Sequence, residues 1–201
     1  MKILGAVCVL LTFCCVSHSS TIYDNTAAIT TDSDHVRRFG PLFDSFTTDS
    51  FGGALVDLKL ILSGDADSTG ILRIGLFADD FGVPGTRITR LGRIRESRLT
   101  DTPSLYDINL RVNPVLSPDT RYWIRLRSGP TALWGWSEDT SGLGVDSEFF
   151  YNTNGLFSNV PSGPYQMSIT TAAVPEPASI GLMFVSCGVL GLLSRRFSRI
   201  G

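Results

Sequence analysis

The feature that most restricts the fold is a period-two alternation of apolar and polar side chains in the middle of the chain. It recurs in residues 54–62, 71–77 and 121–127, and no long segment there has the period of an amphipathic helix. In the first segment the apolar side chains are expected to share the buried face: Val56, Leu58, Leu60 and Leu62. Such segments form half-buried β-strands, so we expect an all-β protein.

Turn-forming residues separate these segments, as in residues 63–70 and 79–85, which are rich in glycine and aspartate. About eight to ten strands fit between residues 21 and 171, each with one solvated face. This number and spacing favour two packed antiparallel sheets. We therefore predict that residues 21–171 form a single domain, a jelly-roll-like antiparallel β-sandwich.

The N-terminus is typical of a secretory signal peptide. A positively charged start and an apolar stretch over residues 3–16 precede small polar residues. We predict that residues 1–20 form this peptide and that the mature chain begins near Thr21. The body of the protein would then be exported.

Residues 172–201 combine three features in succession. The first segment consists of Val174, Pro175, Glu176 and Pro177. Its two prolines break a helix and favour extended backbone. An uncharged apolar run follows at about residues 178–194, and at ~1.5 Å per residue it is only marginally long enough to be a transmembrane helix. It ends in a basic cluster that the positive-inside rule keeps cytoplasmic: Arg195, Arg196 and Arg199.

This succession of Pro-Glu-Pro, short apolar helix and basic tail resembles the PEP-CTERM sorting signal of Gram-negative bacteria. The resemblance implies processing by an exosortase-type membrane protease and a transient stay in the inner membrane. It also implies a final position at the cell surface or outside the cell. A plain membrane anchor at the same place is the alternative.

A second resemblance covers the body of the chain. Residues 72–80, 83–85 and 116–124 are similar to segments of the choice-of-anchor ectodomains of bacterial surface proteins. Those ectodomains share a body and differ in the C-terminal anchor. The resemblance implies a shared fold and location, and it implies no defined activity.

All the cysteines lie in the predicted targeting segments: Cys8, Cys14, Cys15 and Cys187. The mature body is therefore expected to hold no disulfide, no thiolate metal site and no cysteine nucleophile. Its stability must come from packing.

The net charge of −2 argues against a nucleic-acid partner, which usually requires a concentrated basic face. Arginines do cluster in residues 87–98, where they alternate with apolar residues. We interpret them as the solvent-exposed side of strands or of a loop.

The body offers little of the chemistry that an enzyme requires. Its only histidine, His35, lies in a polar segment and is interpreted as a solvated surface residue. Its only glutamates, Glu96, Glu138 and Glu148, lie beside polar residues and not in the apolar setting of a general acid. We predict no enzymatic activity and no cofactor, and an extracellular hydrolase is the least favoured function.

Asp65 and Asp67 lie in a glycine-bounded loop and could offer oxygen ligands to a calcium ion. The loop lacks the full EF-hand spacing, and turn-forming aspartates explain it without a metal. We therefore predict no metal, with this loop as the candidate if calcium does bind.

Trp134 and Trp136 flank Gly135, so in a strand the two indoles point to the same side. They either pack in the core or form a flat aromatic platform on which a sugar ring could stack. With the pair in the core, we expect a structural, matrix-associated surface protein. With an exposed pair, the alternative is a carbohydrate-binding module for exopolysaccharide.

Overall fold

The alternating segments form β-strands, as predicted. The computed structural model describes residues 19–161 and 163–174, which form thirteen strands and one short 3-10 helix, η1 (Glu96–Arg98). The strands pair in antiparallel fashion and form two sheets. The prediction of an all-β protein with two antiparallel sheets is confirmed.

The first sheet has seven strands. Its main order is β1 (Ser19–Asp24), β13 (Met167–Ala172), β4 (Gly53–Ser63), β10 (Leu133–Trp136) and β2 (Asp32–His35). Two further strands also pair with β4, namely β7 (Ser104–Asp107) and β8 (Val115–Leu116).

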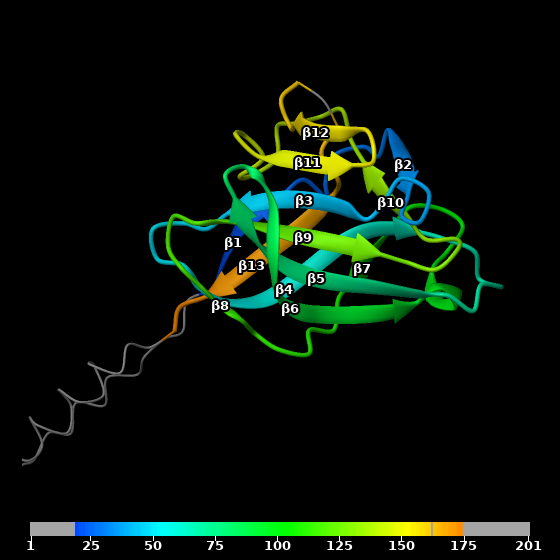
Figure 1. Ribbon diagram of the computed structural model, residues 1–201, viewed down its shortest axis with the longest axis horizontal. Helices are drawn as coiled ribbons and strands as arrows, with labels where there is room; N and C mark the ends of the chain where they lie inside the picture. Colours follow the sequence, from blue (N-terminus) through cyan, green and yellow to red (C-terminus); the bar gives the residue numbers. More distant parts are fainter. Residues whose placement is uncertain (1–18, 162, 175–201) are drawn as a thin grey trace, which may run out of the picture. The chain divides into compact units, whose positions relative to one another are not determined.

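The second sheet has six strands. Their order is β12 (Gly155–Ser158), β11 (Phe149–Asn152), β3 (Leu42–Thr47), β9 (Arg121–Arg127), β5 (Ile71–Asp80) and β6 (Val83–Arg95). Figure 1 shows β3, β9 and β5 side by side, crossing β4 and β13 of the first sheet. The chain passes repeatedly between the sheets, as it does from β3 to β4 and from β4 to β5.

The inward faces of the two sheets share one apolar core. The inward residues of β5 are at most 1% exposed: Leu72, Ile74 and Leu76. The same cluster includes apolar residues of β4: Leu58, Leu60 and Leu62. Fully burying one such side chain contributes about 1.5–3 kcal/mol, so this core holds the sheets face to face.

One residue of β4 departs from the predicted pattern. Val56, which the alternation assigns to the core, is 37% exposed, whereas Leu55 is fully buried. The register with β13 shifts at this point, because Asp57 pairs with Thr170 and Leu55 with Thr171. Val56 is therefore the extra residue of a β-bulge, and a bulge reverses the alternation beyond it. The prediction for Val56 is wrong because a strict period of two contains no signal for a bulge.

Residues 19–161 and 163–174 form thirteen strands, whereas the sequence pattern predicts about eight to ten. Several strands are too short to show an alternation: β8 has 2 residues, and β2, β7 and β12 have 4 residues each. The sequence of β2, Asp-Ser-Asp-His, also contains no apolar residue. Pairing with β10 makes it a strand.

The compact unit of described residues runs from Ser19 to Val174. Ser19 and Ser20 pair with Ala172 and Thr171 along β1 and β13, so the paired region begins before the boundary predicted at Thr21. Within residues 19–161 and 163–174, no helix is both long enough and apolar enough to cross a membrane.

The predicted targeting segments lie mostly outside the described residues. This applies to the apolar stretch at residues 3–16 and to the predicted transmembrane helix at about residues 178–194. It also applies to most of the predicted sorting signal: Pro175, Glu176, Pro177, Arg195, Arg196 and Arg199. Val174 is described and is 46% exposed.

Candidate functional site

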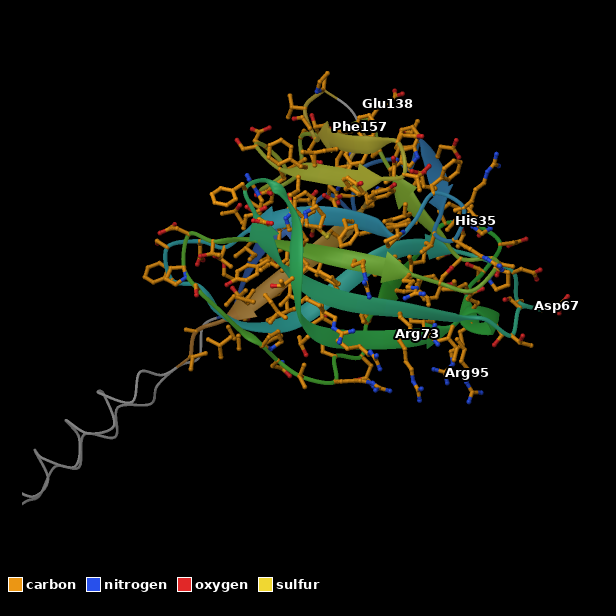
Figure 2. The ribbon with its side chains drawn as sticks, viewed as in Figure 1. His35, Asp67, Arg73, Arg95, Glu138 and Phe157 are labelled. Atoms are coloured by element: carbon orange, nitrogen blue, oxygen red, sulfur yellow. The ribbon has the colours of Figure 1, made fainter. Side chains whose placement is uncertain are left out.

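A cleft of about 580 Å³ opens where short strands of both sheets meet. β2 and β10 of the first sheet contribute one side, and β11 and β12 of the second sheet contribute the other. It is lined by aromatic, acidic and small residues: Asp34, Trp136, Glu138, Phe150, Asn152, Phe157, Pro161 and Gly163. Glu138 and Phe157 lie near each other at this end of the molecule (Figure 2).

Trp134 belongs to the core. Its side chain is fully buried, and its ring stacks on Tyr165 with a centroid separation of 4.6 Å. Its indole Nε1 donates a hydrogen bond of 3.1 Å to the carbonyl oxygen of Gln166. A buried tryptophan usually needs such a partner for its N–H group. For Trp134, the core interpretation is confirmed.

Trp136 has a different environment, although it points to the same side of β10. Its side chain is half-buried and lines the cleft. Its backbone forms a bridge with Tyr165, and Gly163 lies against the ring. A Cβ atom on Gly163 would lie only 2.5 Å from Cε3 of the indole, so only glycine permits this approach. The indole is therefore held in place from one side and accessible from the other.

Asp34 supplies a fixed carboxylate to the cleft. Its Oδ2 accepts a hydrogen bond of 2.5 Å from the Tyr165 hydroxyl and one of 3.2 Å from Asn152 Nδ2. Burial, followed by the hydrogen bond and charge of Asp34, raises the pKa of Tyr165 above its ordinary value. The phenol of a tyrosine is neutral at pH 7 even without this shift, so Tyr165 donates its hydrogen bond to Asp34 and orients the carboxylate.

Phe150 and Phe157 form an aromatic wall of the cleft. Their rings stack with centroids 5.1 Å apart, and Phe150 also meets Tyr165 edge-on at 5.6 Å. Glu138, by contrast, lies exposed at the rim. The arrangement can bind a small molecule that has both an apolar face and polar groups.

Among the residues that line this cleft, the sequence predicts only Trp136 as a binding residue, and it identifies Glu138 only as a carboxylate beside polar residues. Asp34 and Asn152 are far apart in the chain, and the pairing of β2 with β10 and of β11 with β3 brings their strands to this end. No local pattern in the sequence encodes that pairing. The predicted pair of Trp134 and Trp136 is thus divided between the core and the cleft.

The aspartates of the candidate calcium loop are exposed and adopt a turn. Asp65 Oδ1 accepts a hydrogen bond of 2.8 Å from the backbone N–H of Asp67, as turn-forming aspartates do. The described residues contain no group of three or more histidine, cysteine, aspartate or glutamate side chains that could hold a metal ion.

His35 lies near the same loop, in a second hollow of about 720 Å³ that Asp65 also lines. The histidine is half-buried, which differs from the fully solvated position expected. Its Nδ1 is buried and has no hydrogen-bond partner among the described residues.

Two of the three glutamates are buried, although polar residues flank them in the sequence. Glu96 is fully buried, and its Oε2 accepts hydrogen bonds from the Ser68 hydroxyl and from the N–H and hydroxyl of Thr131. Burial acts to raise the pKa of Glu96, but these hydrogen bonds outweigh it and lower the pKa. Glu148 is 2% exposed and pairs with Arg121 at 2.9 Å. Both carboxylates serve to join strands and loops.

A buried acid that the sequence analysis does not single out lies on β3. Asp44 is fully buried between Leu42 and Phe46, on the inward side of the strand. Burial, followed by the negative charge of Glu148, raises the pKa of Asp44 well above its ordinary value. The alternation of Leu42, Asp44 and Phe46 is the signal in the sequence that identifies this position as inward.

No protein-family model matches this chain, and neither a curated protein nor a solved structure matches it.

Proposed function

We propose that the protein is an exported, surface-associated β-sandwich whose cleft binds carbohydrate. The observation that carries this proposal is the position of Trp136, a half-buried indole fixed against Gly163 and open to the cleft that Asp34 also lines. A sugar ring has one apolar C–H face and several hydroxyl groups. The indole suits the face, and oriented carboxylate and amide groups suit the hydroxyls.

The polar groups of the cleft favour binding over hydrolysis. A glycosidase requires two carboxyl groups, one of them a general acid in apolar surroundings. Asp34 is engaged by Tyr165 and Asn152, and Glu138 lies in solvent. These environments support a lectin-like role in an extracellular matrix, with exopolysaccharide as the partner.

Export and sorting are proposed from the ends of the sequence. The signal-peptide pattern of residues 1–20 and the Pro-Glu-Pro, apolar and basic pattern of residues 172–201 support delivery through the inner membrane to an exosortase-type protease. The alternation of the chain between two sheets supports the jelly-roll-like form of the sandwich. The absence of cysteine between residues 21 and 171 is compatible with either redox environment.

The cleft is tested by applying the full-length chain in detergent micelles to an array of oligosaccharides. We expect at least one glycan to bind the wild type, Trp136→Ala to lose it, and Trp136→Phe to keep part of the affinity. The matched control is Phe81→Ala, which removes a ring that is fully exposed at the turn between β5 and β6. The proposal fails if no glycan binds, or if Trp136→Ala binds as tightly as the wild type while remaining folded.

Sorting is tested separately by replacing Pro175, Glu176 and Pro177 with alanine. The apolar run should still insert, so we expect an uncleaved species that remains in the inner membrane. Processing and surface delivery equal to those of the wild type would show that the tail is a plain anchor. Cell fractionation and immunoblotting distinguish these outcomes.

A further inference from the structure

The outer face of the second sheet carries a row of arginines across three neighbouring strands. Arg93 of β6 pairs with Arg73 of β5, and Arg73 pairs with Arg127 of β9. Directly opposed residues in antiparallel strands have Cα atoms about 4.5–5.5 Å apart. Figure 2 shows Arg73 and Arg95 extending from this part of the molecule.

A second row follows along the same strands. Gly75 of β5 pairs with Arg90 on one side and with Arg125 on the other. Because Gly75 has no side chain, it leaves a gap between the two arginines. We call the two rows together the arginine face: Arg73, Arg90, Arg93, Arg125 and Arg127.

Among the described residues, no acidic side chain forms an ion pair with the arginine face. Within the described part of the chain, Arg121 is the only arginine in an ion pair, with Glu148, and the remaining ion pairs involve Lys59. Arg73, Arg93 and Arg127 are exposed. Like charges directly opposite each other destabilise a sheet, so the fold gains nothing from this arrangement.

The arginine face continues into a hollow of about 400 Å³, lined in part by Arg37, Arg125 and Arg127. Arg125 Nε is buried and has no hydrogen-bond partner among the described residues. Burial, and then the charges of other arginines, lower the pKa of Arg125. A bound anion in the hollow would supply the missing negative charge.

Aromatic rings lie beside the arginines but are covered. Trp123 is fully buried, and Phe77 and Phe43 are 7% and 8% exposed. The guanidinium group of Arg125 lies over Phe77, 4.5 Å from the ring centroid. Single-stranded nucleic acids bind to open aromatic platforms on which bases stack, and these three rings provide none.

We propose that the arginine face binds a linear acidic polysaccharide, with carboxylates of successive sugars along Arg93, Arg73 and Arg127 and one carboxylate in the hollow at Arg37. The planar fork of arginine suits carboxylates because it can donate two parallel hydrogen bonds. The choice of a polysaccharide among polyanions rests on the proposed function, whereas the binding of a polyanion rests on the arginines alone.

The test is affinity electrophoresis of the full-length chain in detergent, in gels containing alginate, a polyuronate, or neutral dextran. The variant Arg73→Gln/Arg127→Gln removes two exposed charges from the face. The matched control, Arg98→Gln/Arg111→Gln, removes two exposed charges from η1 and from the loop between β7 and β8. We expect the face variant to be retained about tenfold less by alginate, with a weaker salt dependence, and the control variant to behave as the wild type.

Three results would overturn the proposal. Equal loss in both variants would show a response to net charge and not to the face. Unchanged retention of the face variant would show that the arginine face does not bind alginate. Displacement of alginate by single-stranded DNA at a lower concentration than by free alginate would identify a nucleic acid as the ligand. Failure of the proposed glycan binding in the cleft can be distinguished from failure of polyanion binding at the arginine face, because Trp136→Ala should leave alginate retention unchanged.

Discussion

The cleft draws most of its side chains from four short strands in two sheets, whereas the arginine face draws its side chains from three longer neighbours in one sheet. In the cleft, each fixed group has a partner: Gly163 supports Trp136, and Tyr165 and Asn152 hold Asp34. On the arginine face, the exposed guanidinium groups have no ionic partner among the described residues.

This difference indicates two modes of recognition. A cleft whose groups are held before binding selects its ligand by shape and hydrogen bonds. A row of free cations selects by charge and adapts to the spacing of the ligand. The two surfaces should therefore respond differently to truncation, pH, salt and loss of a rim charge.

The largest expected effect is that of Trp134→Ala. Loss of a fully buried tryptophan costs about 3–5 kcal/mol, and here it also removes the ring stacked on Tyr165, which orients Asp34. Any molecules that remain folded should lose glycan binding at the cleft and keep alginate binding at the arginine face. Urea denaturation and the two binding assays check this. A stable variant with an intact cleft would show that the core does not support the cleft.

The second effect concerns pH and is expected for Asp44→Asn. The pKa of Asp44 in the folded state lies above its unfolded value, so the stability it contributes is present in full at low pH and is lost as the pH rises through the folded pKa. Between the unfolded and the folded pKa, each pH unit lowers the free energy of unfolding of the wild type by up to about 1.4 kcal/mol. The neutral amide should therefore stabilise the fold more at about pH 8 than at about pH 5, as thermal melts would show. Parallel pH profiles for both proteins would contradict this assignment.

The third effect concerns salt and separates the two surfaces directly. Raising sodium chloride from about 0.05 M to about 0.5 M shortens the screening length more than threefold, so alginate retention should fall steeply. Glycan binding at the cleft should change little, because stacking and short hydrogen bonds are weakly screened. Equal salt dependence at both surfaces would mean that the cleft also selects by charge.

The smallest effect is expected for Glu138→Gln at the rim of the cleft. Because Glu138 is exposed, its stability effect should stay within about 0.5 kcal/mol. Glycan affinity should weaken by about two- to tenfold, because one solvated hydrogen bond contributes only about 0.5–1.5 kcal/mol. Thermal melting and array titration measure both quantities. A complete loss of glycan binding would give Glu138 a central role that its position does not suggest.

The alternation along β5 and β9 is sufficient to predict an all-β chain and the inward positions of Leu72, Ile74 and Leu76. The error at Val56 has a local cause, because a bulge depends on the partner strand. The cleft could be predicted only in part. Trp136 is visible as an aromatic beside glycine, but Asp34 reaches the cleft through the pairing of β2 with β10.

The arginine face shows the same limit. The arginines of β6 are conspicuous in the sequence. Arg87, Arg90 and Arg93 are three residues apart, so their shared exposure depends on register shifts in β6 and not on a strict period of two. Their alignment with Arg73 and Arg127 depends on which strands become neighbours, and the order of strands in a sheet is not written in any one segment. Net charge, which averages over the whole chain, conceals a basic face of this kind.

The most direct test of two independent surfaces is a crossed binding experiment with three full-length proteins: the wild type, Trp136→Ala and Arg73→Gln/Arg127→Gln. Each is measured against alginate and against the neutral glycan that binds most tightly on the array. We predict that Trp136→Ala loses only the neutral glycan and that the arginine variant loses only alginate. Loss of both ligands in both folded variants, or of neither ligand in either variant, would contradict the account.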